Sequence, residues 1–118
     1  MNRRAFGSDG ETAACAFLQK KGWEILARNV RRGPGEIDVI ARRGSLTAFV
    51  EVKRRSSTAF GAPAEAVNPQ KQRRIAQAAA IWAQENGVSD GELRFDVIEI
   101  LPGSIRHLEG AFDATDFF

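Results

Sequence analysis

The chain has 118 residues, of which 43% are hydrophobic and 27% are charged, with a net charge of +2 and one cysteine. This length suffices for one domain with its own core, and a single Cys15 excludes an internal disulfide and a cysteine-rich zinc site, which fits a reducing cytoplasm. No apolar run approaches the length of a membrane span, so we expect a cytoplasmic protein with no membrane partner.

The first predicted element is a helix over residues 8–21. Ser8 and Glu11 have the spacing of a capping box, in which a serine and a later glutamate satisfy the backbone amides at a helix start. Gly22 is expected to end this helix, and alternating side chains predict a strand over residues 23–31. The helical spacing of apolar side chains predicts a buried stripe of Ala14, Phe17 and Leu18.

Two further strands, over residues 35–40 and 49–53, are separated by Gly44 and Ser45, a pair typical of a two-residue hairpin loop. With the loop at this pair, the residue numbers of any two directly facing residues add up to 89. One face of the hairpin is then wholly apolar, and a slip by one residue would bury charged side chains, so the register is well specified. The apolar face consists of Ile37, Val39 and Ala41 opposite Val52, Val50 and Ala48.

The other face of the hairpin carries charge, because the same register places Asp38 opposite Glu51 and Glu36 opposite Lys53. Directly opposed like charges destabilise a strand pair, and a hard divalent cation such as Mg²⁺ between Asp38 and Glu51 would relieve the repulsion. Lys53 leaves the same face within reach of a phosphate on that ion, which is a constellation suited to phosphodiester cleavage. The alternative is a solvated charged face on which Lys53 and neighbouring arginines neutralise the acids.

The segment after the hairpin, residues 56–68, lacks strong periodicity and is predicted to be a loop in which Phe60 plugs the core rather than stacks on a base. A helix then begins with Asn68 as its N-cap and Pro69 at its first position, and continues to about Asn86.

The last part of the chain is predicted to add strands. Residues 92–101 form a strong strand on which Arg94 and Asp96 share a face and make an ordinary ion pair, while His107 receives no role. The predicted order is α-β-β-β-α-β, with one further strand as an option, which indicates an α/β domain on a mixed central sheet. We place one domain over 1–118, with a core over about 8–101 and an edge strand and tail over 102–118.

Basic side chains cluster around the hairpin and at the start of the second helix, although the net charge alone is weak evidence for nucleic acid. Clustered Lys and Arg supply most of the sequence-independent affinity for DNA or RNA. Solvated edge-strand charges that block aggregation explain some of these residues equally well. The candidate nucleic-acid-binding residues are Arg32, Arg54, Arg55, Lys71 and Arg74.

A strand-borne aspartate followed on the next strand by Glu-x-Lys resembles the PD-(D/E)xK nuclease superfamily, which has the restriction-endonuclease-like fold. Five longer motifs extend this pattern: Gly35-Glu36-Ile37-Asp38, Phe49-Val50-Glu51-Val52-Lys53, Phe60-Gly61-x-Pro63, Lys71-x-x-Arg74 and Arg94-Phe95-Asp96-Val97. With these motifs the chain resembles the small bacterial YraN-like family, which is similar to the archaeal Holliday-junction resolvases. The resemblance covers most of the chain and implies a three-layer fold with a mixed central β-sheet flanked by helices. One departure is Ile37, where the superfamily nominally has proline.

The resemblance implies that Asp38 and Glu51 ligate Mg²⁺, for which Mn²⁺ can substitute, and that the Val52 carbonyl completes the metal site. Lys53 would orient or activate the attacking water. The superfamily also places an acidic residue on the first helix, which falls on Glu11. Glu11 therefore has two interpretations, as a helix cap and as an active-site acid, and one residue can serve both.

The expected function is metal-dependent hydrolysis of phosphodiester bonds by an endonuclease. DNA is preferred over RNA, and branched or single-stranded DNA over plain duplex, on the resolvase resemblance alone. Symmetric cleavage of a four-way junction needs two sites, so a resolvase would be a homodimer. Two alternatives stay open: a non-catalytic nucleic-acid-binding module with a vestigial site, and an adaptor that holds a protein partner through the loop and Phe117-Phe118.

Overall fold

The structure is a computed structural model, and it describes residues 3–55 and 67–113, with side chains from Gly10 onward. The predictions made for Phe60, most of its loop and the Phe117-Phe118 tail lie outside the described residues. The order of elements is the predicted one, and the further last strand is present. The elements are α1 (Arg3–Lys20), β1 (Glu24–Arg32), β2 (Gly35–Arg43), β3 (Leu46–Arg54), α2 (Pro69–Glu85), β4 (Glu92–Leu101) and β5 (Ser104–Phe112).

The five strands form one mixed sheet in the order β1-β2-β3-β4-β5. Every neighbouring pair is antiparallel except β3 and β4, which run parallel and are connected through α2. Parallel neighbours need a long crossover connection, and α2 supplies it. The β2–β3 hairpin turns at Gly44 and has the predicted register, from Val39 opposite Val50 to Arg43 opposite Leu46.

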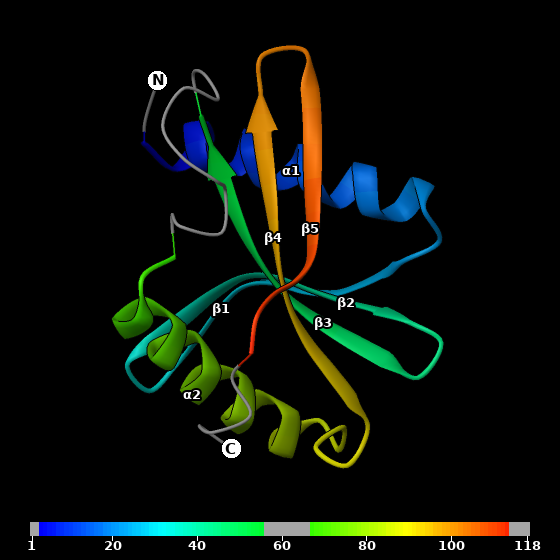
Figure 1. Cartoon of the computed structure of the whole chain (residues 1–118), viewed down its shortest axis with the longest axis vertical. Coiled ribbons are helices and arrows are strands. Elements are labelled where there is room, and N and C mark those ends of the chain that lie inside the picture. Colours follow the sequence, from blue (N-terminus) through cyan, green and yellow to red (C-terminus); the bar gives the residue numbers. More distant parts are fainter. Residues whose placement is uncertain (1–2, 56–66, 114–118) are drawn as a thin grey trace.

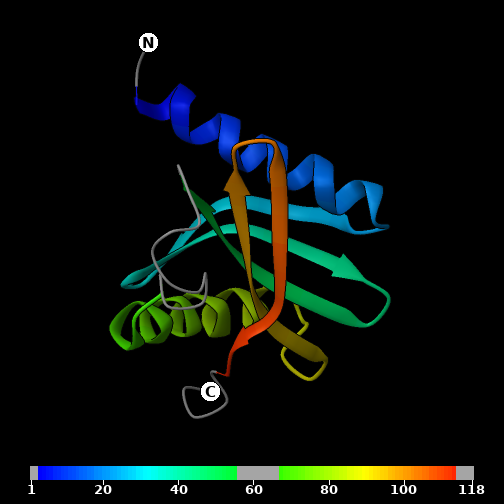
Figure 2. The ribbon, with the colours of Figure 1, turned by 45° about the horizontal axis from the view of Figure 1, so that its top comes forward.

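The helices cover opposite faces of the sheet, with α1 on one side and α2 on the other, so the fold has three layers (Figures 1 and 2). The core between α1 and the sheet includes Leu18, Trp23, Val50 and Ile98, together with Cys15, which is a buried free thiol. The core under α2 is larger and richer in alanine and aromatic side chains. It includes Ile37, Ile40, Phe49, Ile75, Ala78, Ala79, Trp82, Phe95 and Val97.

Helix α1 begins earlier than predicted. It starts at Arg3, so Ser8 lies inside the helix and the proposed capping box of Ser8 and Glu11 is wrong. The residues before Ser8 include two arginines and an alanine, which favour helix and allow it to extend past the serine. The end of α1 is as expected, because Gly22 has a φ of 91° and the amide of Trp23 donates to the carbonyl of Leu18.

Helix α2 starts as the sequence predicts and packs closely on β2. Oδ1 of Asn68 accepts a 2.9 Å hydrogen bond from the amide of Lys71, which caps the helix, and Pro69 follows. At Gly35, an added Cβ would lie only 2.6 Å from the carbonyl carbon of Arg74 and 3.1 Å from Cβ of Ala78. Gly35 therefore permits a close approach between the backbones of β2 and α2.

Strand β5 is fastened to β4 around a buried carboxylate. Asp96 accepts hydrogen bonds from Arg94 at 2.8 and 2.9 Å and from the amide of Gly110 at 2.9 Å, and it lies 2.8 Å from Nε2 of His107. Burial opposes ionisation of Asp96, but the hydrogen bonds from His107 and Arg94 outweigh it and lower the pKa of this carboxyl. The predicted Arg94–Asp96 ion pair is confirmed, whereas the contact with His107 was not foreseen.

Candidate active site where β2 and β3 part

The candidate site begins where the ladder between β2 and β3 stops. Backbone pairing reaches Val39 opposite Val50 and extends no further, although the same register would place Asp38 opposite Glu51. At this point the side chain of Asp38 replaces a backbone acceptor, since its Oδ2 accepts a 2.8 Å hydrogen bond from the amide of Val52. The alternation of faces also breaks here, since Ile37 packs in the core under α2 and Val39 in the core under α1. The expectation that Ile37 and Val39 share one face is therefore wrong.

Asp38 and Glu51 approach each other closely enough to share a proton. Burial, and then the negative charge of Glu51, raise the pKa of Asp38 to about 7, although the hydrogen bond from Val52 works in the opposite direction. A hydrogen bond between the two carboxyl groups adds to the rise. A carboxyl with such a pKa beside a second, buried carboxylate is typical of sites that bind cations or perform acid–base chemistry.

Two lysines meet at Glu51, whose side chain is only 7% exposed. Nζ of Lys71 lies 2.5 Å from Oε1 of Glu51, and Nζ of Lys53 lies 3.8 Å from the same oxygen. Burial and the adjacent Lys71 lower the pKa of Lys53. For Lys71, burial is the largest effect and opposes the charge, but the hydrogen bonds to Glu51 and Lys53 and the negative charges of Glu51 and Asp38 together outweigh it and raise the pKa.

Glu11 belongs to the same neighbourhood. Its negative charge adds to the rise of the Asp38 pKa, after the larger effects of burial and Glu51. Oε2 of Glu11 is buried and has no hydrogen-bond partner among the described residues, and it forms an ion pair with the guanidinium of Arg28 at 3.7 Å. Because Glu11 lies within α1 and not at its start, this carboxylate has no capping role.

The acidic residues do not form a closed metal cage. Within residues 10–55 and 67–113, whose side chains the structure describes, no group of three carboxylate, imidazole or thiolate side chains is arranged to hold an ion. Two carboxylates with an additional oxygen from outside the protein suit Mg²⁺, which commonly keeps several waters and binds one or two carboxylates plus substrate phosphate. Asp38 and Glu51 therefore fit such an ion.

The predicted phosphate-binding residues have different surroundings. Arg32 is paired with Glu85 at 2.7 Å, and Arg55 with the fully buried Glu99 at 2.8 Å, so both have structural partners. Arg54 is exposed at the end of β3, where its aliphatic stem lies over Gly10 of α1. The ion pairs of Arg32 and Arg55 are not evident from the sequence, because Glu85 and Glu99 are far from these arginines along the chain.

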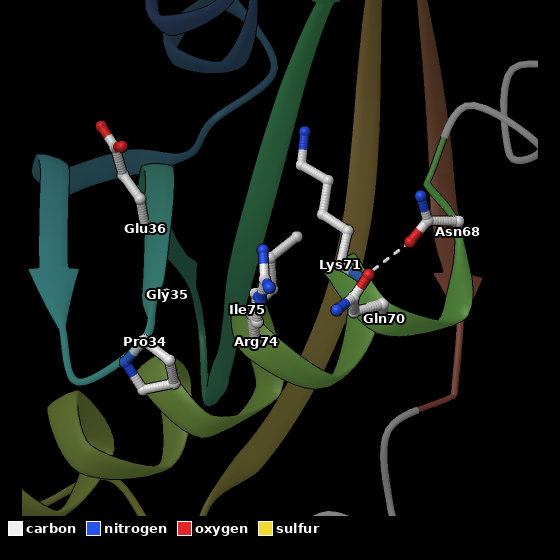
Figure 3. Close-up of a pocket in the computed structure, with 8 residues that line it drawn as sticks. All are labelled: Pro34, Gly35, Glu36, Asn68, Gln70, Lys71, Arg74 and Ile75. Carbon is white, nitrogen blue, oxygen red and sulfur yellow. Dashed lines mark hydrogen bonds between the residues drawn. The ribbon is translucent and has the colours of Figure 1, made fainter.

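A pocket of about 300 Å³ lies next to Lys71, between the start of α2 and the start of β2 (Figure 3). Figure 3 shows Pro34, Gly35 and Glu36 on one side of it and the first turns of α2 on the other. Arg74 lines this pocket, and its side chain makes no hydrogen bond or ion pair within the described part of the chain. The pocket therefore offers a cationic group beside the acidic site.

The sequence identified Lys71 as a phosphate contact and missed its bond to Glu51. That bond depends on how α2 docks on the sheet, where it packs on β2 and β1.

No helix among the described residues is long and apolar enough to cross a membrane.

The fold is the restriction-endonuclease-like α/β fold, as predicted. A solved structure of Archaeoglobus fulgidus Hjc, described as a Holliday junction resolvase from an archaeal hyperthermophile, superposes with a TM-score of 0.53 and 20% sequence identity. The match covers 86% of this chain and 75% of that one.

Residues 10–100 match the Uncharacterised protein family UPF0102, the YraN-like family, and the chain belongs to this family. A UPF0102 protein of Geotalea daltonii is 45% identical over 117 residues, which cover 95% of this chain and 92% of the relative. A UPF0102 protein of Symbiobacterium thermophilum is 44% identical over 119 residues, which cover 97% of this chain and all of the relative. The predicted family membership is thus confirmed.

Proposed function

We propose that the protein is a metal-dependent nuclease that hydrolyses phosphodiester bonds. The observation that carries this proposal is the meeting of Asp38 and Glu51 where two strands part, with two lysines on the buried Glu51 carboxylate. Like charges are rarely gathered in a half-buried place without a cation to bind, and perturbed carboxyls in such places are candidates for functional sites. The restriction-endonuclease-like fold adds support by analogy.

Asp38 and Glu51, with the carbonyl of Val52, would hold Mg²⁺ or Mn²⁺, and Glu11 would support the site through a bound water. The ion supplies Lewis acidity towards a phosphoryl oxygen and a lowered pKa for bound water. The Val52 amide keeps the Asp38 carboxylate oriented. Lys53, whose pKa is lowered by burial and by Lys71, is suited to orient the attacking water and to neutralise charge on the phosphate.

The substrate class we propose is DNA rather than RNA, and branched or single-stranded DNA in particular. Support comes from the likeness of the fold to that of a protein described as a Holliday junction resolvase. Arg74 beside the pocket and Arg54 at the end of β3 are the cationic side chains best placed to hold phosphates. A resolvase reaction would also require a homodimer.

The test is cleavage of four-way junction, flap, single-stranded and duplex DNA and structured RNA, with Mg²⁺ or Mn²⁺ added. Asp38→Ala and Lys53→Ala should lower cleavage by about 100-fold or more, the usual size of a lost catalytic group. Asp90→Asn, which alters an exposed acid on the loop before β4, is the matched control and should cleave normally. Cleavage that persists in Asp38→Ala would reject this site.

A non-catalytic nucleic-acid-binding module is the second candidate. The contact between Lys71 and Glu51 favours it, because an acidic pair neutralised by a protein ammonium has less need of a metal. Salt-sensitive DNA binding that Asp38→Ala leaves unchanged, without cleavage of any substrate, would support this alternative. The adaptor hypothesis depends mainly on residues outside the described ones and stays a prediction.

A further inference from the structure

The two lysines at Glu51 make unequal contacts. The Lys71 ammonium is at hydrogen-bonding distance from Oε1 of Glu51 (2.5 Å), whereas the Lys53 ammonium lies 3.8 Å from the same oxygen. Glu51 is nearly buried, so little water competes with Lys71 for its carboxylate. Charge-assisted hydrogen bonds are roughly twice as strong as neutral ones. Lys71 is therefore the principal cation on Glu51.

A divalent ion ligated by Glu51 would meet the Lys71 ammonium at this carboxylate. Mg²⁺ binds carboxylate oxygens at about 2.0–2.1 Å, so both cations would lie within a few ångströms of each other. Their repulsion is strong in partly buried surroundings, where screening is weak. One of the two cations must therefore move away from Glu51. The Lys71 ammonium is able to do so, because it is carried on a flexible four-carbon stem.

The pocket next to Lys71 provides space into which the Lys71 side chain can turn. Lys71 is itself one of the lining residues, and the space of about 300 Å³ lies between α2 and the start of β2 (Figure 3). Glu36 lines the opposite side of the pocket, is half exposed and pairs with Arg31 at 3.3 Å. The Lys71 ammonium can leave Glu51 and stay in contact with water, since the Lys71 side chain is 38% exposed.

We propose that Lys71 competes with the divalent ion for Glu51 and turns towards this pocket when the ion binds. The inference rests on the proposed function, because it takes Glu51 as a metal ligand. Lys71 is in this respect a positioning residue. It neutralises the acidic pair before the ion arrives, sets how tightly the ion is held, and brings a positive charge to the pocket, beside Arg74, where a substrate phosphate would be met.

The first test is Mn²⁺ binding without substrate, measured from the electron paramagnetic resonance signal of the hydrated ion. Lys71→Met should bind Mn²⁺ about tenfold or more tightly than the wild type, the size expected for removing a charged hydrogen bond that must otherwise be broken. Arg74→Met is the matched control, because it removes the same charge one helical turn away without contact to Glu51. It should change the affinity by less than about threefold. Equal effects of the two variants would overturn the proposal.

A second test uses the wild-type chain and does not depend on a folded variant. Acylation of lysine amines by an activated ester, followed by mass spectrometry, reports how accessible each ammonium is. Saturation with Mn²⁺ should raise the acylation rate of Lys71 several-fold, because its amine loses the Glu51 partner, while Lys20 at the exposed end of α1 should not change. An unchanged or lower rate at Lys71 would contradict the competition.

The outcomes also separate this inference from the proposed function. If neither the wild type nor Lys71→Met binds Mn²⁺, the metal site fails and the inference fails with it. If the wild type binds Mn²⁺ and Asp38→Asn does not, the metal site is supported. A Lys71→Met variant with the Mn²⁺ affinity of the wild type would then reject only the competition between Lys71 and the ion.

Discussion

The amide of Val52 donates to the side chain of Asp38, at 2.8 Å, in the place where the next step of the β2–β3 ladder would have had a backbone partner. The carboxylate thereby satisfies a partly buried strand amide and marks the point where the two strands separate. A substitution at Asp38 must therefore be judged on two effects, the loss of a charge and the loss of an acceptor. Asparagine removes the charge and keeps an acceptor oxygen, which makes Asp38→Asn the informative change.

Asp38→Asn should change how stability depends on pH. The pKa of Asp38 is raised from 3.8 to about 7 by burial and then by Glu51, so the folded state holds this proton more tightly than the unfolded state. The free energy of unfolding should therefore fall as the pH rises from about 4 to about 7, by up to about 1.4 kcal/mol per pH unit, and level off above. Asp38→Asn should lack this fall and exceed the wild type in stability above neutral pH.

Urea unfolding over this pH range, with a chelator present, measures both proteins. Asp90→Asn serves as the control, because it removes an exposed carboxylate and should follow the wild-type curve. Parallel curves for wild type and Asp38→Asn would show that Asp38 has an ordinary pKa.

Glu11→Gln distinguishes a site residue from a helix cap. Loss of a capping side chain typically costs about 1 kcal/mol, but Glu11 lies inside α1 and so should show no such loss. Removing its charge relieves repulsion at Asp38, so the variant should be as stable as the wild type or slightly more so near neutral pH. Cleavage should nevertheless fall by about tenfold or more, since Glu11 would support the metal site. A destabilised variant with full activity would reverse this assignment.

Gly35→Ala should disrupt the contact between β2 and α2. The added methyl group would overlap the carbonyl of Arg74, which is helix backbone and cannot rotate away. Overpacking of this kind costs about 1–3 kcal/mol and shifts the elements involved, so the start of α2 should move away from Glu51. Gly91→Ala is the matched control, because its methyl group would lie 3.4 Å from the nearest atom. The melting temperature should fall in Gly35→Ala, whereas its Mn²⁺ affinity should rise, because Lys71 then competes less for Glu51. Both quantities should stay unchanged in Gly91→Ala.

Asp96→Asn should destabilise the fold and leave Mn²⁺ binding at the proposed metal site unchanged. The substitution leaves Arg94 and His107 without their charged partner in a buried place, which costs about 3 kcal/mol or more. Because the pKa of Asp96 is lowered, the wild type has this stabilisation above about pH 4 and loses it as the pH falls further. Chemical unfolding should show the deficit at neutral pH, whereas Mn²⁺ affinity of the folded variant should match that of the wild type. A loss of Mn²⁺ binding would instead connect Asp96 to the site.

Local signals in the sequence predicted most of the fold. The Gly44 turn and the alternation of apolar residues specified the β2–β3 register, and Asn68 with Pro69 specified the start of α2. The start of α1 was misplaced because a capping-box pattern is short and common, and strong helix formers before Ser8 extend the helix.

The acidic pair was predictable because Asp38 and Glu51 belong to one hairpin with a defined register. The contact of Lys71 with Glu51, the pairing of Arg55 with Glu99 and that of His107 with Asp96 were not. Each depends on how separate elements dock, and sequence spacing carries no information about that geometry. The change of faces between Ile37 and Val39 was not predictable from the sequence either, because it occurs where the Asp38 side chain replaces a backbone hydrogen-bond partner.

The connectivity of the sheet has a consequence for the order in which the site is assembled. Asp38 and Glu51 are brought together by a hairpin of short sequence separation, and closing such a loop is fast and costs little entropy. Lys71 and Glu11 arrive only when α2 and α1 dock, and the parallel β3–β4 pairing must wait for the whole crossover. During folding the two carboxylates therefore meet before the lysine that neutralises one of them is in place, and a divalent ion in the cell would find its ligands before the chain has finished folding.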